Sequence, residues 1–246
     1  MHTFLGISEK VSELELHPEA IEASQYVYLE GYLVTSPSAR AAAVKARQIA
    51  EKQGVKTALT FSDPNMVKFF RDGLQEMAGN GVDLLFCNQQ EALFWAETDS
   101  IEEAAERLKA TAKTFAITLG SEGALVFDGK DTHLVPATPV KAVDTNGAGD
   151  LFAGAFLYGL THGYSYAKAG ALATKAGVGL IAGTRVSVPG SPQPLMLPQA
   201  ADMRTMAEAV RRARAQVDVL MVSFHQHWDL DVPPGAIRPQ PAQAPP

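Results

Sequence analysis

Two aspartates flank a pair of glycines in VDTNGAGDLFAG, residues 143–154, directly before an apolar stretch. If Gly147, Ala148 and Gly149 form the turn into a helix, the first N–H groups of that helix have no partner within it and carry partial positive charge. Such groups bind anions, and glycines let the backbone approach a ligand closely. The pattern therefore predicts an anion hole for a phosphate or a developing oxyanion.

Asp150 follows this predicted turn. A carboxylate there would repel a bound phosphate unless it has a chemical role. The role that fits is a general base, which takes the proton from a hydroxyl that attacks phosphorus while the backbone amides stabilise the transferring group. The alternative is an ordinary first-turn acid stabilised by the helix dipole. Because two glycines and two acids cluster at one strand end, the pattern favours the catalytic role.

Two other phosphate-binding patterns do not fit this segment. A dinucleotide fingerprint requires G-x-G-x-x-G, whereas Phe152 stands at the position of the third glycine. The chain also contains no G-x-x-x-x-G-K-[ST] sequence, which excludes a Walker A loop.

Short apolar runs alternate with helical patterns along the chain. Strands are expected at 26–34, 56–61, 82–88, 114–120, 123–129, 132–137 and 140–143, and helices at 36–54, 64–79, 89–96, 100–112 and 148–163. This alternation predicts an α/β fold, a mainly parallel sheet with helices on both faces. Ligands bind such sheets at the carboxyl ends of the strands, and SDPN, CNQQE, TLGSEG and DTNGAGD each follow a strand.

The composition narrows the class of function. The chain has 246 residues, a net charge of −6 and a pI of about 5.5, which argues against nucleic-acid binding. Its single cysteine, Cys87, excludes an internal disulfide and a multi-cysteine zinc site. Neither a signal-peptide pattern nor an apolar run of membrane-spanning length is present. We therefore expect a cytoplasmic protein without nucleic-acid or membrane partners.

Three motifs together resemble one family. Residues 143–160 resemble the second signature of the ribokinase, or PfkB, family of sugar and nucleoside kinases. CNQQE, at 87–91, resembles that family's N-x-x-E motif, and TLGSEGALV, at 118–126, resembles its nucleotide-phosphate strand and turn. YVYLEGYLV and FSDPNMVKFFRD are most similar to the adenosine-kinase-like branch. The resemblance implies a three-layer α/β/α sandwich that transfers a phosphoryl group from ATP, with Mg²⁺, to a hydroxyl of a small sugar or nucleoside.

The resemblance also implies a role for each motif residue. Asp150 would be the catalytic base, beside an anion hole formed by Gly147, Ala148 and Gly149. The other implied roles are positioning of magnesium and phosphate through water by Asn88 and Glu91, lining of the ATP site by Thr118, Gly120 and Gly123, and binding of an activating monovalent cation such as K⁺ by Asp144 and Asn146.

Each of these roles has a structural alternative. Asn88 and Glu91 are spaced like the N-cap and N3 residues of a helix. Gly120 and Gly123 could be ordinary turn residues, and Thr118 an ordinary strand residue. Four aromatic residues nearby are expected in the core, namely Phe69, Phe70, Phe94 and Trp95.

The resemblance extends over roughly residues 3–175. Compared with family members, we expect the chain to lack the first strands, the lid and most acceptor contacts, so that residues 1–182 form an N-terminally truncated kinase core with weak or no turnover. The loss of strands would leave an open sheet edge, which could support a homodimer.

Residues 183–246 are expected to form a linker, a helix–strand appendage and a disordered proline-rich tail. The appendage resembles a fragment of the poly-gamma-glutamate capsule-biosynthesis family, in which a strand ending in SFH carries a metal-site histidine, matched here by His225. His227 and Asp229 are further candidate ligands, but the other ligands of such a site are not found in the sequence, which favours a pair of surface histidines instead. A metal-dependent phosphoesterase fragment and a non-catalytic nucleotide-binding remnant therefore remain as alternatives to the kinase.

Overall fold

One six-stranded sheet organises the protein, whose computed structural model describes residues 10–137, 139 and 147–181. The strand order is β1-β2-β3-β4-β5-β6. The strand bounds are Tyr26–Glu30 for β1, Lys56–Thr60 for β2, Val82–Asn88 for β3, Ala112–Thr118 for β4, Ala124–Phe127 for β5 and Thr132–Val135 for β6. β1 to β4 are parallel, whereas β4, β5 and β6 pair antiparallel. The expected mainly parallel sheet is confirmed.

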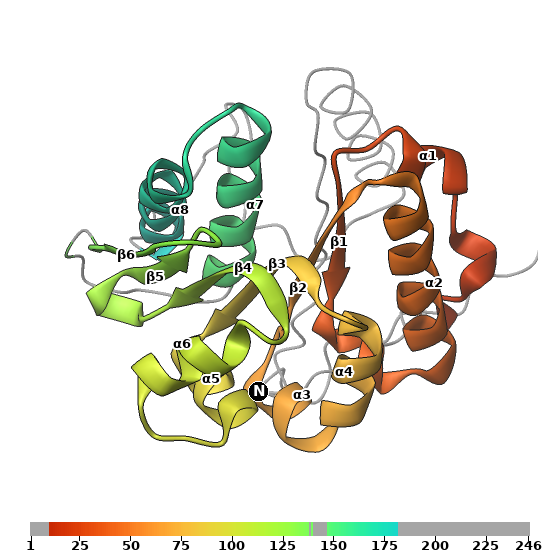
Figure 1. The fold of residues 1–246 in the computed structure, drawn as a ribbon, viewed down its shortest axis with the longest axis horizontal. Helices are drawn as coiled ribbons and strands as arrows, with labels where there is room; N and C mark the ends of the chain where they lie inside the picture. The colour runs from red at the N-terminus through yellow and green to blue at the C-terminus, as the bar shows by residue number, and fades with distance from the viewer. Residues whose placement is uncertain (1–9, 138, 140–146, 182–246) are drawn as a thin grey trace, which may run out of the picture.

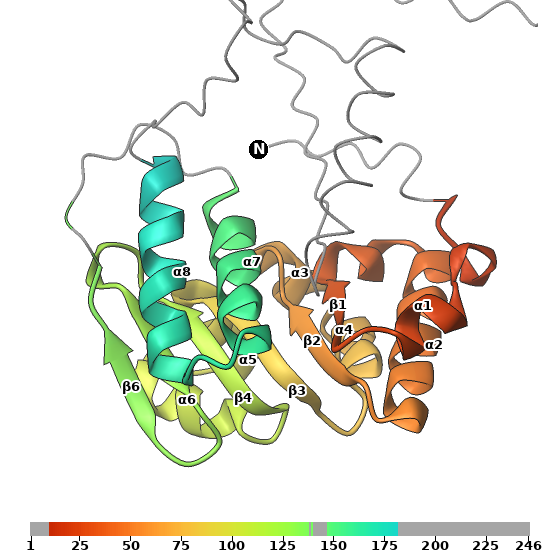
Figure 2. The ribbon, with the colours of Figure 1, turned by 90° about the horizontal axis from the view of Figure 1, so that it is seen from above.

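Helices cover both faces of the sheet. Their bounds are α1 Pro18–Glu22, α2 Pro37–Gln53, α3 Pro64–Phe69, α4 Arg71–Ala78, α5 Gln89–Ala96, α6 Ile101–Leu108, α7 Ala148–Thr161 and α8 Tyr166–Ile181, with short 3-10 turns at Glu13–Glu15, Gly31–Thr35 and Gly120–Glu122. Figures 1 and 2 show α7 and α8 on one face and α2 to α6 on the other. Each face has its own buried apolar cluster. The predicted three-layer α/β/α arrangement is therefore confirmed.

Local signals set the bounds of α2 as predicted. The Ser36 side chain accepts a hydrogen bond from the backbone N–H of Ala39, Pro37 is the first helical residue, and Gly54 ends the helix with a φ of 72°. The single helix expected over 64–79 is instead two helices, because Phe70, with φ −129°, interrupts it.

The expectation of four core aromatics was right only for Trp95, which is buried and donates from Nε1 to Thr111 Oγ1 at 2.9 Å. Phe69 is 67% exposed, and Phe70 and Phe94 are also exposed. Phe69 lies in α3, Phe70 between α3 and α4, and Phe94 in α5.

Aromatic packing fixes the start of α7 over the sheet. The Phe86 ring, near the carboxyl end of β3, lies 6.4 Å from the Phe152 ring and 5.5 Å from the Phe156 ring, both in edge contacts. Because all three side chains are buried, α7 cannot slide along the sheet without breaking these contacts. The first turn of α7 is thereby held near the carboxyl end of β3.

Some expectations lie outside the described residues. These are the strand at 140–143 and every element predicted for the segment 183–246. No helix in the described part of the chain is both long and apolar enough to cross a membrane.

Candidate functional site

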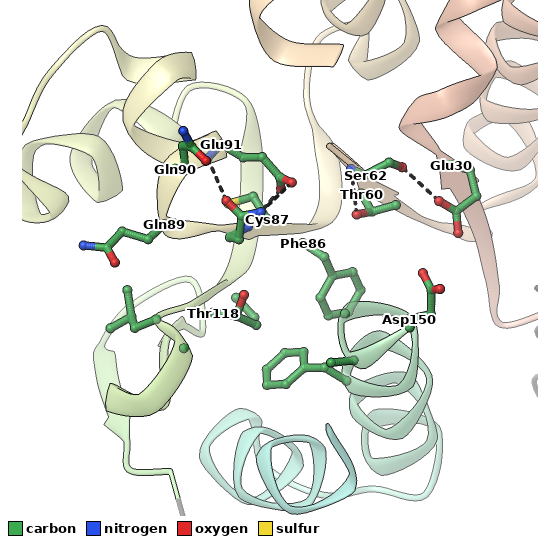
Figure 3. Close-up of a pocket in the computed structure, with 18 of the residues that line it drawn as sticks. Glu30, Thr60, Ser62, Phe86, Cys87, Gln89, Gln90, Glu91, Thr118 and Asp150 are labelled. Carbon is green, nitrogen blue, oxygen red and sulfur yellow. Dashed lines mark hydrogen bonds between the residues drawn. The ribbon is translucent and has the colours of Figure 1, made fainter. Parts of the chain in front are cut away.

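A cavity of about 860 Å³ opens at the carboxyl ends of the first four strands and the start of α7. Its wall consists of Glu30, Tyr32, Thr60, Ser62, Phe86, Cys87, Asn88, Gln89, Gln90, Glu91, Ala116, Thr118, Leu119, Gly120, Gly147, Ala148, Gly149, Asp150 and Phe152. Figure 3 shows part of this wall, with Asp150 at the N-terminal end of α7. The cavity therefore lies where a parallel α/β sheet is expected to bind its ligand.

The predicted anion hole lies on this wall. Gly147 is the N-cap of α7 with a φ of 74°, a conformation that glycine adopts without strain. The first helical hydrogen bond runs from Leu151 N–H to Gly147 C=O at 3.0 Å. Among the described residues outside its own helical turn, a Cβ added to Gly149 would meet no atom within 4 Å, so packing in this part of the chain does not explain the glycine. The described residues thus leave space for a ligand beside Gly149.

Asp150 is the third residue of α7, half-buried and on the cavity wall. It is therefore a first-turn acid at a helix N-terminus, as the structural alternative proposed. It also lies on the cavity wall beside Gly147, Ala148 and Gly149, and its role as a catalytic base stays a prediction.

Asn88 and Glu91 form a complete capping box at the start of α5. Glu91 N–H donates to Asn88 Oδ1 at 2.9 Å, while Asn88 N–H and Nδ2 donate to Glu91 Oε2 and Oε1 at 2.9 and 2.7 Å. The capping alternative is therefore correct. Both residues also line the cavity, so the cap presents a carboxylate to any ligand bound there.

Glu91 is an unusually buried carboxylate, with only 3% of the residue exposed. Burial raises its pKa from the ordinary 4.5 to about 7, and the nearby Asp63 also raises it, whereas the Asn88 backbone N–H lowers it. The folded state therefore holds the Glu91 proton more tightly than the unfolded chain. The contribution of protonated Glu91 to the free energy of unfolding is therefore fully present below about pH 4.5, and it is lost as the pH rises through about 7.

The substitution Glu91→Gln tests this titration. Because glutamine does not ionise, the variant should gain stability relative to the wild type as the pH rises from 5 to 8, by roughly 2–3 kcal/mol. Urea unfolding of both proteins at each pH measures the difference. A difference that does not change with pH would contradict the raised pKa.

Of the three residues expected in the ATP site, two line the cavity and one does not. Thr118, at the end of β4, and Gly120 line the cavity. Among the described residues, the wall does not include Gly123. That residue has a φ of 104°, and a Cβ on it would overlap Val135 C=O. The close approach of β6 therefore explains why residue 123 is a glycine. Contact between Gly123 and ATP stays a prediction.

Sequence reasoning missed the wall formed by the ends of β1 and β2. Glu30, Tyr32, Thr60 and Ser62 lie there. The pKa of Tyr32 is raised to about 12, first by burial and then by nearby acids that include Asp150 and Glu30. A signal was present, because Glu30 is a charged residue at the end of an apolar strand. Asp63, which follows β2, instead caps α3, because its side chain accepts a hydrogen bond from Asn65 N–H at 2.7 Å.

The remaining expected ligands cannot be located. Asp144 and Asn146, and the tail residues His225, His227 and Asp229, lie outside the described residues. Within the part of the chain that the structure describes, no group of three or more His, Cys, Asp or Glu side chains is placed to hold a metal ion.

Comparison with known proteins identifies the family. Residues 3–191 match the model of the pfkB family of carbohydrate kinases, which is most of the chain. The chain belongs to this family. The resemblance carried by the sequence motifs is thereby confirmed at the level of the family.

Relatives include nucleoside and sugar kinases. The adenosine kinase of Saccharomyces cerevisiae is 34% identical over 164 residues, which cover 61% of this chain and 47% of the relative. The crystal structure of adenosine kinase from Sinorhizobium meliloti is 34% identical with a TM-score of 0.68, and that of a probable sugar kinase from Rhizobium etli is 32% identical with a TM-score of 0.68. The alignments cover 83% and 84% of this chain, and 59% of each structure. The chain thus spans about half the length of the yeast enzyme.

Proposed function

We propose that this protein transfers the γ-phosphoryl group of ATP to a hydroxyl of a sugar or nucleoside. One observation carries the proposal. The first turn of α7, with Asp150, opens into the same cavity as Asn88, Glu91, Thr118 and Gly120. Membership of a carbohydrate-kinase family supports this chemistry.

In this proposal, the first turn of α7 binds the phosphoryl group in transit. The N–H groups of Gly147, Ala148 and Gly149 hydrogen-bond its oxygens as charge develops. Asp150 accepts the proton of the attacking hydroxyl. The hydroxyl oxygen then bonds to the γ-phosphorus while the bond between that phosphorus and the β-phosphate oxygen breaks. The proton ends on the Asp150 carboxylate and ADP is the leaving group.

In this proposal, ATP and the acceptor bind at different ends of the cavity. We infer that the nucleotide binds on the β4 side, beside Thr118 and Gly120, and that the acceptor binds at the ends of β1 and β2, beside Glu30 and Ser62. Figure 3 shows the Asp150 and Glu30 side chains on the same side of the cavity in this view, and the pKa of Tyr28 is raised first by burial and then by these two carboxylates. A carboxylate accepts hydrogen bonds from sugar hydroxyls, so Glu30 can orient the acceptor.

The polar residues of the cavity fit magnesium bound together with ATP. Mg²⁺ keeps several waters and takes one or two carboxylates with substrate phosphates, so it does not require a cluster of three protein ligands. Glu91 supplies one buried carboxylate, and Asn88 holds it in place. When bound, magnesium would neutralise charge on the β- and γ-phosphates. Binding of K⁺ by Asp144 and Asn146 stays a prediction.

The similarity to adenosine kinases favours adenosine, or a similar nucleoside or sugar, as the acceptor. A coupled assay of ADP release with adenosine, ribose and fructose, run at high protein concentration, tests the proposal. We expect ADP release that depends on one acceptor and on Mg²⁺. ATP binding by calorimetry without any turnover would contradict the proposal and favour a non-catalytic nucleotide-binding protein. The same assay also tests the sequence-based expectation of weak or no turnover, of which the proposal requires a weak but measurable rate.

A further inference from the structure

Ser62 has an unusual backbone conformation on the cavity wall. Its φ is 66°, in the left-handed region, where residues other than glycine are uncommon. It lies two residues after the end of β2 and lines the same cavity as the first turn of α7. Its N–H donates to Thr60 Oγ1 at 3.2 Å. A residue stays in such a conformation when surrounding contacts determine it, and such residues cluster at functional sites.

The Ser62 hydroxyl joins the ends of two strands. Oγ accepts a hydrogen bond from Gly31 N–H at 2.8 Å and donates to Glu30 Oε2 at 2.9 Å. A hydroxyl has one proton, so donation to Glu30 leaves its lone pairs for Gly31. Figure 3 shows the bond from Ser62 to Glu30 at the edge of the cavity.

The backbones at the ends of β1 and β2 are also in close contact. A Cβ added to Gly31 would lie 2.5 Å from Phe61 O and 2.7 Å from Thr60 O, so the end of β1 is pressed against the end of β2. The backbone of Glu30 is therefore fixed by packing, and the Ser62 hydroxyl adds a charge-assisted contact to its side chain.

We propose that Ser62 is a positioning residue for the acceptor site. Its hydroxyl holds the Glu30 carboxylate at the cavity, on the side of Asp150, where Glu30 can bind an acceptor hydroxyl. This inference rests on the proposed kinase function for the acceptor, but the position of the Glu30 carboxylate can be tested without it. The left-handed backbone of Ser62 serves this contact, because it aims the hydroxyl back at β1.

Two substitutions separate the hydroxyl from the backbone. Ser62→Gly removes the hydroxyl and suits the left-handed conformation, whereas Ser62→Asn tolerates that conformation and supplies an amide that can donate. We expect Ser62→Gly to raise the acceptor KM about tenfold and to leave the ATP KM unchanged. Ser62→Asn should recover part of the loss. A fold defect would instead lower the fraction of active protein and change both KM values little.

Two structural readouts do not depend on turnover. In Ser62→Gly, the Gly31 amide loses its acceptor and should exchange its hydrogen faster, while a crystal structure should show the Glu30 carboxylate displaced from its wild-type position. An unchanged acceptor KM, or a Glu30 carboxylate that stays in place, would overturn the proposal. If the wild type phosphorylates no acceptor, the kinase proposal fails, and the position of Glu30 in the variant still decides the role of Ser62.

Discussion

Asp150→Asn is expected to lower kcat for phosphoryl transfer by about 10²–10⁴-fold. Asparagine keeps the size of the side chain but cannot accept the proton of the attacking hydroxyl. The backbone N–H groups at the start of α7 are unchanged, so the ATP dissociation constant should stay within about threefold of the wild-type value. Steady-state kinetics gives kcat, and calorimetry gives the ATP affinity. Because the result is a ratio, it does not depend on the absolute rate of the wild type.

Asp63→Asn is a matched control for this substitution. Asp63 caps α3 near the cavity but is not on the cavity wall. Asparagine is also a good N-cap, so the control should keep kcat within about threefold. Near-normal turnover in Asp150→Asn would refute the catalytic assignment. An equal loss in Asp63→Asn would show that the effect comes from the charge of the region and not from a base at residue 150.

Gly149→Ala is expected to weaken ATP binding by about 10–100-fold without loss of stability. In the part of the chain that the structure describes, the new methyl group meets no atom beyond its own helical turn within 4 Å, so the fold can accept it. Alanine is also a better helix residue than glycine, which should leave stability equal or raise it by up to about 1 kcal/mol. If phosphates approach this backbone closely, however, the methyl group occupies their place, and overpacking of this kind costs about 1–3 kcal/mol.

Gly159→Ala, in the same helix, should show the opposite pattern. Its Cβ would lie 2.9 Å from the Ala169 Cβ, where α7 packs against α8, away from the cavity wall. We expect lower stability and nearly unchanged ATP affinity. Thermal unfolding and calorimetry on both variants make the comparison. Unchanged ATP affinity in Gly149→Ala would contradict the anion hole at the start of α7.

The features predicted well from the sequence are set by local chemistry. Ser36, Pro37 and Gly54 act within one turn of the α2 ends, so their pattern predicts the bounds of that helix. The cavity residues Asn88 and Asp150 could likewise be found, because Asn88 ends an apolar strand and Asp150 follows a glycine-containing turn, and both signals are local.

The features that were missed depend on contacts between distant segments. The exposure of Phe69 and Phe94 depends on which helix face meets the sheet, and composition does not reveal that face. Gly123 is needed because β6 passes beside it. The role of Ser62 arises from hydrogen bonds to Glu30 and Gly31, about thirty residues earlier in the chain. A local sequence pattern does not predict hydrogen bonds between residues so far apart in the chain.

The central claim is that the first turn of α7 binds the migrating phosphoryl group and that Asp150 deprotonates its acceptor. Phosphorus-31 NMR of concentrated protein with Mg²⁺, ATP and adenosine, ribose or fructose tests it most directly. The account predicts that a phosphomonoester signal grows with ADP in the wild type and is nearly lost in Asp150→Asn. A phosphomonoester that accumulates equally fast in both proteins would contradict it.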